Sequence, residues 1–301
     1  MMVQHGSRFN SLIRYIGWPL LALLVWDVAV TALYVLVHRE GSVELPSLPV
    51  SLFGSVLVLF LGVRTNAAYA RWWEARTLWG AVVNASRSFG RETLHLVSGA
   101  AAPAQAAQRR MVRRQVAYAQ ALRLHLLRQD LTPALHLLST EETRDAQYAR
   151  FSNVPNALLN RHAADMAHCH AQGWLDRYDR VRLENTLVDL SNAQGGLERI
   201  KNTPLPKQYG QYLRFFVTAF CVLLPIGLVD SLLYYTPLAS TAVGFILMTI
   251  DEIGKDLQDP FTNSIHDVPM ESICRTIQID LMESIGETAP TPAQSVDGVL
   301  W

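Results

Sequence analysis

Cysteine is scarce in this sequence, with three residues among 301, at Cys169, Cys221 and Cys274. The number is odd and the positions are far apart, so they form neither a disulfide framework nor the spacing of a metal-binding motif. We interpret them as thiols of the protein core or of a lipid-facing surface. The sequence also lacks a cleavable secretion signal, because the apolar run after Arg14 has no small-residue cleavage site, and we expect this run to be retained.

Signatures of enzymes and of nucleotide-binding proteins are missing as well. The sequence contains no Gly-rich phosphate loop and no nucleophile elbow. No stretch of useful length alternates as a strand does, and no internal repeat is visible. We therefore predict an all-α protein that is not an enzyme and needs no cofactor.

Long apolar runs are what the sequence does contain. Tyr15–His38 carries a single formal charge, and Leu48–Val63, Phe215–Val229 and Ser231–Ile250 carry none. The second run is short, about 24 Å at the helical rise, but it crosses a bilayer if the helix extends beyond it. Pro237 suggests a turn between the last two runs. A buried helix of a soluble protein explains one such run but not four, so we predict four transmembrane helices.

The net charge is zero, but the charges are unevenly distributed. Residues 64–214 hold 21 of the 26 Lys and Arg but 12 of the 26 Asp and Glu, a net charge of about +9. The short loop between the first two runs, "REGSVELPS", is not basic. The positive-inside rule therefore predicts that the N-terminus, the central region and the C-terminus all lie in the cytoplasm. Because the arginines alternate with acids on amphipathic helices, we favour a solvated surface over nucleic-acid binding.

These patterns divide the chain into four regions. Residues 1–63 hold the N-terminal segment and the first two transmembrane helices, and residues 64–210 form a cytosolic helical region that continues from the second helix. Residues 211–257 hold the third and fourth transmembrane helices. Residues 258–301 form a cytosolic C-terminal segment, whose tail we expect to be disordered or to lie along the surface.

One face of the second apolar run carries Ser55, Leu59 and Val63, which are spaced four apart and so share one side of a helix. A single helix forms no pore. If several copies surround an axis, such a ring of small and branched side chains makes a narrow neck from which water withdraws. Contact with lipid or ordinary helix packing explains the same pattern and stays open.

Three segments carry a resemblance to a known family. They are "LGVRTNAAYARWWEARTLWG" (61–80), "AQGGLERIKNTPLPKQY" (193–209) and "LQDPFTNSIHDVPM" (257–270). In their order, spacing and four-span layout, over roughly residues 10–285, they resemble the bestrophin family on its bacterial side. The residues that match the family's motifs are Arg71, Trp72, Trp73, Glu74, Asp259, Pro260 and Phe261.

The resemblance implies a homopentameric ion channel of the bacterial inner membrane, with the second helix of each subunit around the axis. Counting back from Arg71, the family's apolar neck falls on Val63, Leu59 and Ser55. Ser55 departs from the family's bulkier residue, which suggests a wider or wetter outer neck. The family's second, cytosolic constriction falls near Tyr178 and Val181.

The resemblance also has implications for the permeant ion and for the role of calcium. The resemblance implies passive conduction of monovalent ions, and the bacterial branch favours Na⁺ and K⁺, with a chloride channel as the alternative. The acidic run that binds Ca²⁺ in eukaryotic members is missing here, so we expect no calcium gating. The expected partners are other copies of this chain, the lipid bilayer and small monovalent ions.

Two further classes of function remain open. His162, His168 and His170 suggest a membrane-bound metalloprotein, but their spacings of six and two do not place them on one helical face. A scaffold without transport activity is the other alternative. Asp27 lies within the first apolar run, where a carboxylate faces either a cavity or a hydrogen-bonding partner on a neighbouring helix.

Overall fold

The computed structural model describes residues 9–40, 49–99, 102–138, 142, 148–296 and 298–301. Within these ranges the chain is mostly helical, and the one β-bridge joins Val296 to Val299. The predicted all-α fold is confirmed for this part of the chain. Contacts divide the chain into two compact units. The apolar unit contains helix α1 (Phe9–Glu40), helix α2 (Val50–Leu96) up to Arg71, and Pro204–Asp259. The polar unit contains Trp72–Thr203 and Pro260–Trp301.

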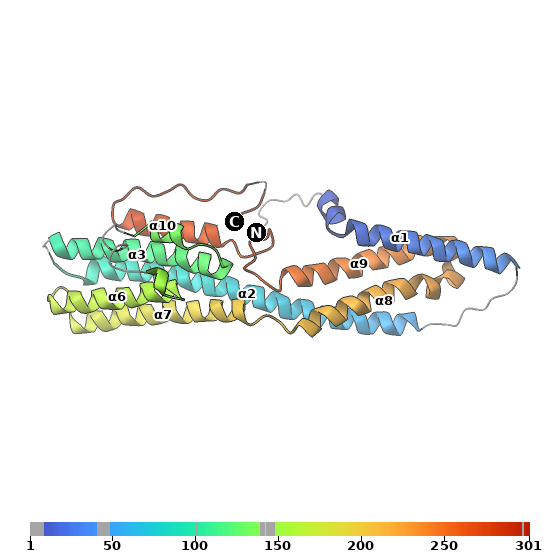
Figure 1. Ribbon diagram of the computed structural model, residues 1–301, viewed down its shortest axis with the longest axis horizontal. Coiled ribbons are helices and arrows are strands. Elements are labelled where there is room, and N and C mark those ends of the chain that lie inside the picture. Colours follow the sequence, from blue (N-terminus) through green and yellow to red (C-terminus); the bar gives the residue numbers. More distant parts are fainter. Residues whose placement is uncertain (1–8, 41–48, 100–101, 139–141, 143–147, 297) are drawn as a thin grey trace. The chain divides into compact units, whose positions relative to one another are not determined.

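The apolar unit is built on three long helices that pack against one another, α1 (Phe9–Glu40), α8 (Lys207–Leu232) and α9 (Thr236–Asp256) (Figure 1). A short 3₁₀ turn, η2 (Leu233–Tyr235), separates α8 from α9. The backbone of Leu233 has φ of 44°, which ends the helix, and Pro237 follows in the first turn of α9. The turn predicted from Pro237 is therefore present.

Three stretches of the described residues are long and apolar enough to cross a membrane. They are Ile16–Val37, a window within Val50–Leu96, and Gly210–Asp256. The third stretch contains both α8 and α9, so the apolar unit holds four apolar helices including the first part of α2. The chain is thus a membrane protein by the length and composition of its helices.

Helix α2 (Val50–Leu96) runs for 47 residues without a break and contributes to both units. No proline interrupts it. Its first part is apolar, and Trp72, Trp73 and Trp79 follow the first charged residue, Arg64. Trp side chains combine an apolar body with one hydrogen-bond donor, which suits a helix that passes from hydrocarbon to water.

The polar unit is a bundle of the second part of α2 with α3 (Ala102–Leu127), α6 (Val154–Ala171), α7 (Arg177–Asn202) and α10 (Met270–Ser284) (Figure 1). The single turns α4 (Thr132–Leu135) and η1 (Tyr148–Arg150) complete its helices among the described residues. Its largest fully buried apolar side chains include Trp79, Phe89, Tyr118, Leu122 and Leu158 from these helices and Phe261 from the turn between α9 and α10.

Two helices of this bundle begin at residues whose side chains cap them. The side chain of Asn153 accepts a hydrogen bond of 3.0 Å from the amide of Asn156 at the start of α6, and Pro155 lies in the first turn. Asp176 caps α7 in the same way. Each cap satisfies amide groups that the helix itself leaves unpaired.

Arg114 lies inside the polar unit and is fully buried. Its guanidinium donates to a carboxylate oxygen of Glu142 and, at 2.7 Å, to Asp165, which also accepts from Arg110 at 3.1 Å. Burial would raise the pKa of Asp165, but the two guanidinium groups outweigh it and lower that pKa. Burial raises the pKa of Glu142, although Arg114 opposes the shift. We call Arg110, Arg114, Glu142 and Asp165 the buried charge cluster.

His162 lies beside this cluster, and its burial predicts that the free energy of unfolding depends on pH. Its ring is fully buried and meets the Phe89 ring edge-on at 4.5 Å between centroids. Burial, and then the nearby Arg114 charge, lower the pKa of His162 well below its usual value. Below about pH 6.5 the unfolded chain binds a proton here that the folded chain does not, so the free energy of unfolding falls as the pH falls.

The variant His162→Leu should remove this contribution. Between pH 7 and pH 5 the wild-type free energy of unfolding should fall by about 2 kcal/mol more than that of the variant, because one proton contributes about 1.4 kcal/mol per pH unit. Denaturant unfolding of the detergent-solubilised protein at both pH values measures the difference. An equal pH dependence of the free energy of unfolding in the two proteins would contradict the lowered pKa of His162.

The C-terminal tail lies against α10 rather than apart from the bundle. The amide of Ser272 in the first turn of α10 donates to the carbonyl of Trp301 at 2.6 Å. The side chains of Glu271 and Arg275 face tail residues Thr291 and Gln294 around a small cavity of about 230 Å³. Of the two outcomes expected for the tail, the surface-lying one is observed in the described residues.

Candidate functional site

The first part of α2 buries one narrow side within its own subunit. Leu57, Leu61, Arg64 and Ala68, spaced by four, three and four residues, are between 0% and 6% exposed. In an α-helix this spacing places all four on one face. The buried side of α2 is therefore the side that packs against the rest of the apolar unit.

The three predicted neck residues lie on the other side of α2 and share one face, which we call the neck stripe. Leu59 and Val63 are 68% and 53% exposed, and Ser55 is also exposed. At about 100° per residue, Leu59 lies roughly 160° around the helix from the buried Leu61. The Ser55 hydroxyl donates to the carbonyl of Ser51 at 2.8 Å, so its polar group is satisfied within α2.

An apolar groove of about 680 Å³ lies between α2 and α8, beside the neck stripe. Phe53, Val56 and Phe60 of α2 face Tyr212 and Phe216 of α8 across it. The groove is within the apolar unit and is lined almost entirely by carbon atoms. The flank of the neck stripe that borders this groove is therefore almost entirely apolar.

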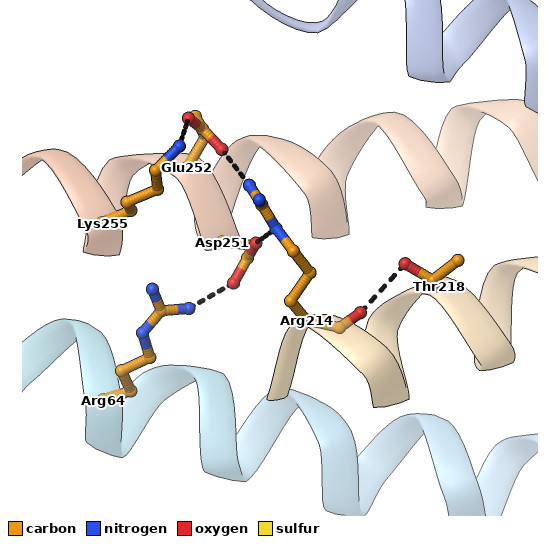
Figure 2. Close-up of polar contacts among 6 residues, drawn as sticks. All are labelled: Arg64, Arg214, Thr218, Asp251, Glu252 and Lys255. Carbon is orange, nitrogen blue, oxygen red and sulfur yellow. Dashed lines mark hydrogen bonds and ion pairs between the residues drawn. The ribbon is translucent and has the colours of Figure 1, made fainter. Parts of the chain in front are cut away.

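A network of charged side chains joins α2, α8 and α9 at the end of the neck stripe (Figure 2). Arg64 of α2, which directly follows Val63, donates to the carboxylate of Asp251 on α9. The Nε of Arg214 on α8 lies 3.5 Å from the other oxygen of Asp251. Arg214 also donates to Glu252 at 2.8 Å, and Lys255 donates to Glu252 at 2.6 Å. Sequence reasoning missed this network, because Arg64 and Asp251 are 187 residues apart.

Asp27 of α1 is fully buried and faces α9. Its two carboxylate oxygens accept hydrogen bonds from Ser240 at 3.1 Å and from Thr241 at 2.8 Å. Of the two possibilities raised for Asp27, hydrogen bonding to a neighbouring helix is the observed one. Asp27 therefore joins α1 to α9 inside the apolar unit.

Trp72 and Glu74, two of the family-motif residues of α2, join this helix to other parts of the polar unit. The indole N–H of Trp72 donates to the carbonyl of His266 at 3.0 Å. The centroid of the Trp73 ring lies 6.5 Å from that of the Trp72 ring. Glu74 forms an ion pair with Arg199 of α7.

The second motif follows α9 and is tied to α7. Asp259 is the last residue of the apolar unit, and Pro260 begins the second segment of the polar unit. Lys201 near the end of α7 donates to the carbonyl of Phe261 at 3.0 Å, and the Phe261 side chain is buried. The carbonyl of Pro260 accepts from the amide of Val268 at 3.4 Å, which closes the turn.

The two candidate residues of the cytosolic constriction lie on the exposed side of α7. Tyr178 is 84% exposed and Val181 is 55% exposed. Both are near the start of the helix, after the Asp176 cap. The described chain covers neither of them.

The three histidines are separated by the fold. His162 is in the core, His168 meets the Trp174 ring edge-on, and His170 Nδ1 lies 2.8 Å from the carbonyl of Leu175. Among the described residues no group of three or more His, Cys, Asp or Glu side chains is arranged to hold a metal ion. All three cysteines are free and buried, as the sequence suggested.

Comparison with known proteins identifies close relatives. Residues 6–283 match the family model described as bacterial/fungal bestrophin protein. The chain is 34% identical over 296 residues to the voltage-dependent anion channel-forming protein YneE of Escherichia coli strain K12, which covers 98% of this chain and 93% of YneE. It is also 34% identical over 293 residues to the voltage-dependent anion channel-forming protein RSc3414 of Ralstonia nicotianae, covering 94% of each chain.

Solved structures agree with the sequence relatives. The crystal structure of a bacterial bestrophin homologue from Klebsiella pneumoniae is similar with a TM-score of 0.83 and 30% sequence identity. The match covers 91% of this chain and 99% of that one. Together with the length of the family match and the membrane-spanning helices, these likenesses establish that the chain belongs to the bestrophin family, a family of ion channels and not of enzymes.

Proposed function

We propose that five copies of this chain surround a central pore in the bacterial inner membrane and conduct small monovalent ions passively. In each copy α1, α2, α8 and α9 cross the membrane, and α2 lines the axis. Ser55, Leu59 and Val63 form the neck, which excludes water when it is narrow. The observation that carries this proposal is the position of the neck stripe, opposite the face of α2 that is buried in its own subunit.

Both termini are proposed to lie in the cytoplasm. Arg64 and Arg214 stand at the same end of the apolar unit, where they share Asp251. The excess of Lys and Arg in residues 64–214 continues from this end. Positive charge next to the ends of spanning helices favours the cytoplasmic side.

We propose that the conducted ions are anions. The expectation of cation selectivity receives no support from the relatives, because YneE and RSc3414 are both named as anion channel-forming proteins. An apolar neck carries no fixed charge, so the charges beside it decide the sign of the permeant ion. The net charge of about +9 over residues 64–214 favours anions.

A second constriction at Tyr178 and Val181 and the absence of calcium gating are further parts of the proposal. Tyr178 and Val181 are exposed on α7 and so are free to line a passage. In the segment after α9 the carboxylate of Asp267 accepts hydrogen bonds from the amides and hydroxyls of Thr262 and Ser264. The oxygens of Asp267 thus form hydrogen bonds within the turn rather than being available to Ca²⁺. Conduction should therefore persist in the presence of a calcium chelator.

Recording from planar bilayers that contain only the purified protein tests this function. With a tenfold gradient of NaCl, an anion-selective pore should reverse close to the chloride potential, about 59 mV from zero. A reversal potential of the opposite sign would restore the cation alternative. The absence of any current would favour the scaffold alternative, and the metalloprotein alternative predicts stoichiometric metal in the same preparation.

A further inference from the structure

Arg64 is the first charged residue of α2 and follows the last residue of the neck stripe. We propose that the Arg64–Asp251 ion pair is a positioning pair that sets the rotation of α2 about its own axis and thereby aims the neck stripe. The inference rests on the proposed function, because it concerns which side of α2 faces the conduction path.

Apolar packing alone sets this rotation poorly. Between Val50 and Val63 the helix carries no charge and Ser51 and Ser55 are its only polar residues, and the side chains of Phe53, Val58 and Phe60 are as exposed as those of the neck stripe. Hydrophobic burial has no direction, and in a bilayer lipid tails replace apolar neighbours at little cost. Several rotations of α2 would therefore bury similar amounts of apolar surface.

The ion pair is directional where the apolar contacts are not. The Arg64 side chain is 5% exposed and the Asp251 side chain 8% exposed. Turning α2 by one residue, about 100°, would carry the guanidinium away from the carboxylate. A buried charge without its partner is strongly unfavourable, so one rotation is selected.

Helix α9 approaches α2 closely beside Arg64. A Cβ atom at Gly254 of α9 would lie 3.2 Å from the Thr65 hydroxyl oxygen, which is tighter than an ordinary contact. Glycine at this position therefore lets α9 approach α2 next to the ion pair, an observation that is independent of the pair itself.

Cysteine labelling measures the rotation directly. The three native cysteines are buried, so Leu59→Cys and Leu61→Cys are each introduced into the full-length protein, reconstituted in liposomes. A charged, water-soluble thiol reagent should modify residue 59 much faster than residue 61, because only the neck stripe faces the conduction path through which the reagent enters the open pore. We then add the double substitution Arg64→Met and Asp251→Leu, which replaces the pair by apolar side chains of similar length and so preserves the fold.

In the double-substituted background the two labelling rates should come within about tenfold of each other, because α2 then populates more than one rotation. The same two substitutions at the exposed pair Arg87 and Asp280, which joins α2 to α10, are the matched control and should leave the preference for residue 59 unchanged. The single variant Arg64→Lys, which keeps the charge without the planar fork, should weaken the preference less.

The outcomes separate this inference from the function on which it rests. An unchanged preference for residue 59 after loss of the pair would overturn the positioning role while leaving the pore intact. If residue 59 is already unreactive in the otherwise unmodified protein, the proposed neck itself is wrong. If the double variant does not assemble, the labelling ratio in Arg64→Lys decides, and a ratio equal to the unmodified one would reject the inference.

Discussion

Replacing Leu59 with threonine should raise the unitary conductance of the channel about tenfold, which corresponds to a barrier lower by about 1.4 kcal/mol. Leu59 is the middle residue of the neck stripe and is 68% exposed in the single chain. In the proposed ring of copies its isobutyl group would repel water from the narrowest part of the path. The threonine side chain is smaller than that of leucine and so widens the neck. Its hydroxyl group also forms hydrogen bonds with water there.

The control for this variant is Leu33→Thr in α1. Leu33 is 64% exposed in the apolar unit, almost as much as Leu59, but it lies on another helix. The same loss of apolar surface there should leave the conductance unchanged. Single-channel recording in symmetric chloride compares the two variants. An increase of equal size in both would show that the neck stripe has no special place in conduction.

Replacing Arg114 with methionine should lower the free energy of unfolding by about 3–5 kcal/mol, the cost of breaking a buried ion pair by removing one of its members. Arg114 is fully buried and pairs with Glu142 and Asp165. Without it Asp165 keeps Arg110, while Glu142 loses the ion pair observed here. The loss should appear as a fall of roughly 10 °C in the melting temperature of the solubilised protein.

The neighbouring residue provides the matched control. Arg113 is 44% exposed at its side chain and pairs with Glu287 at 2.8 Å. Because an exposed ion pair is worth about 1 kcal/mol or less, Arg113→Met should change the melting temperature little. Adding Glu142→Leu to Arg114→Met should recover much of the stability, since it removes the buried carboxylate that has lost Arg114. Equal effects of Arg113→Met and Arg114→Met would contradict the buried charge cluster.

Much of the candidate site was within reach of sequence reasoning, but its supporting contacts were not. The spacing of Ser55, Leu59 and Val63 placed them on one face of a helix, and the structure places that face away from the subunit's own core. The Arg64–Asp251 pair joins residues 187 positions apart, and no local pattern links such residues. His162 illustrates the same limit, since burial beside Arg114 decides its charge.

The sequence by itself determined the helical elements and their order. The continuity of α2 from an apolar into a polar stretch, the end of α8 before Pro237 and the capped starts of α6 and α7 all depend on neighbours along the chain. Runs with at most one charge likewise marked the helices that are long and apolar enough to cross a membrane. Such properties are local and can be recognised without knowledge of the fold.

Only the tertiary structure decided which side of each apolar helix is buried and which charges meet. From Val50 to Val63, α2 has apolar residues on every side and only two serines, so its periodicity does not reveal the side that packs against α8 and α9. That choice depends on Asp251 and Gly254 of α9, which approach Arg64 from a distant part of the chain. Burial and ion pairing between remote segments are collective properties of the fold, and they decided the orientation of the neck stripe within the subunit.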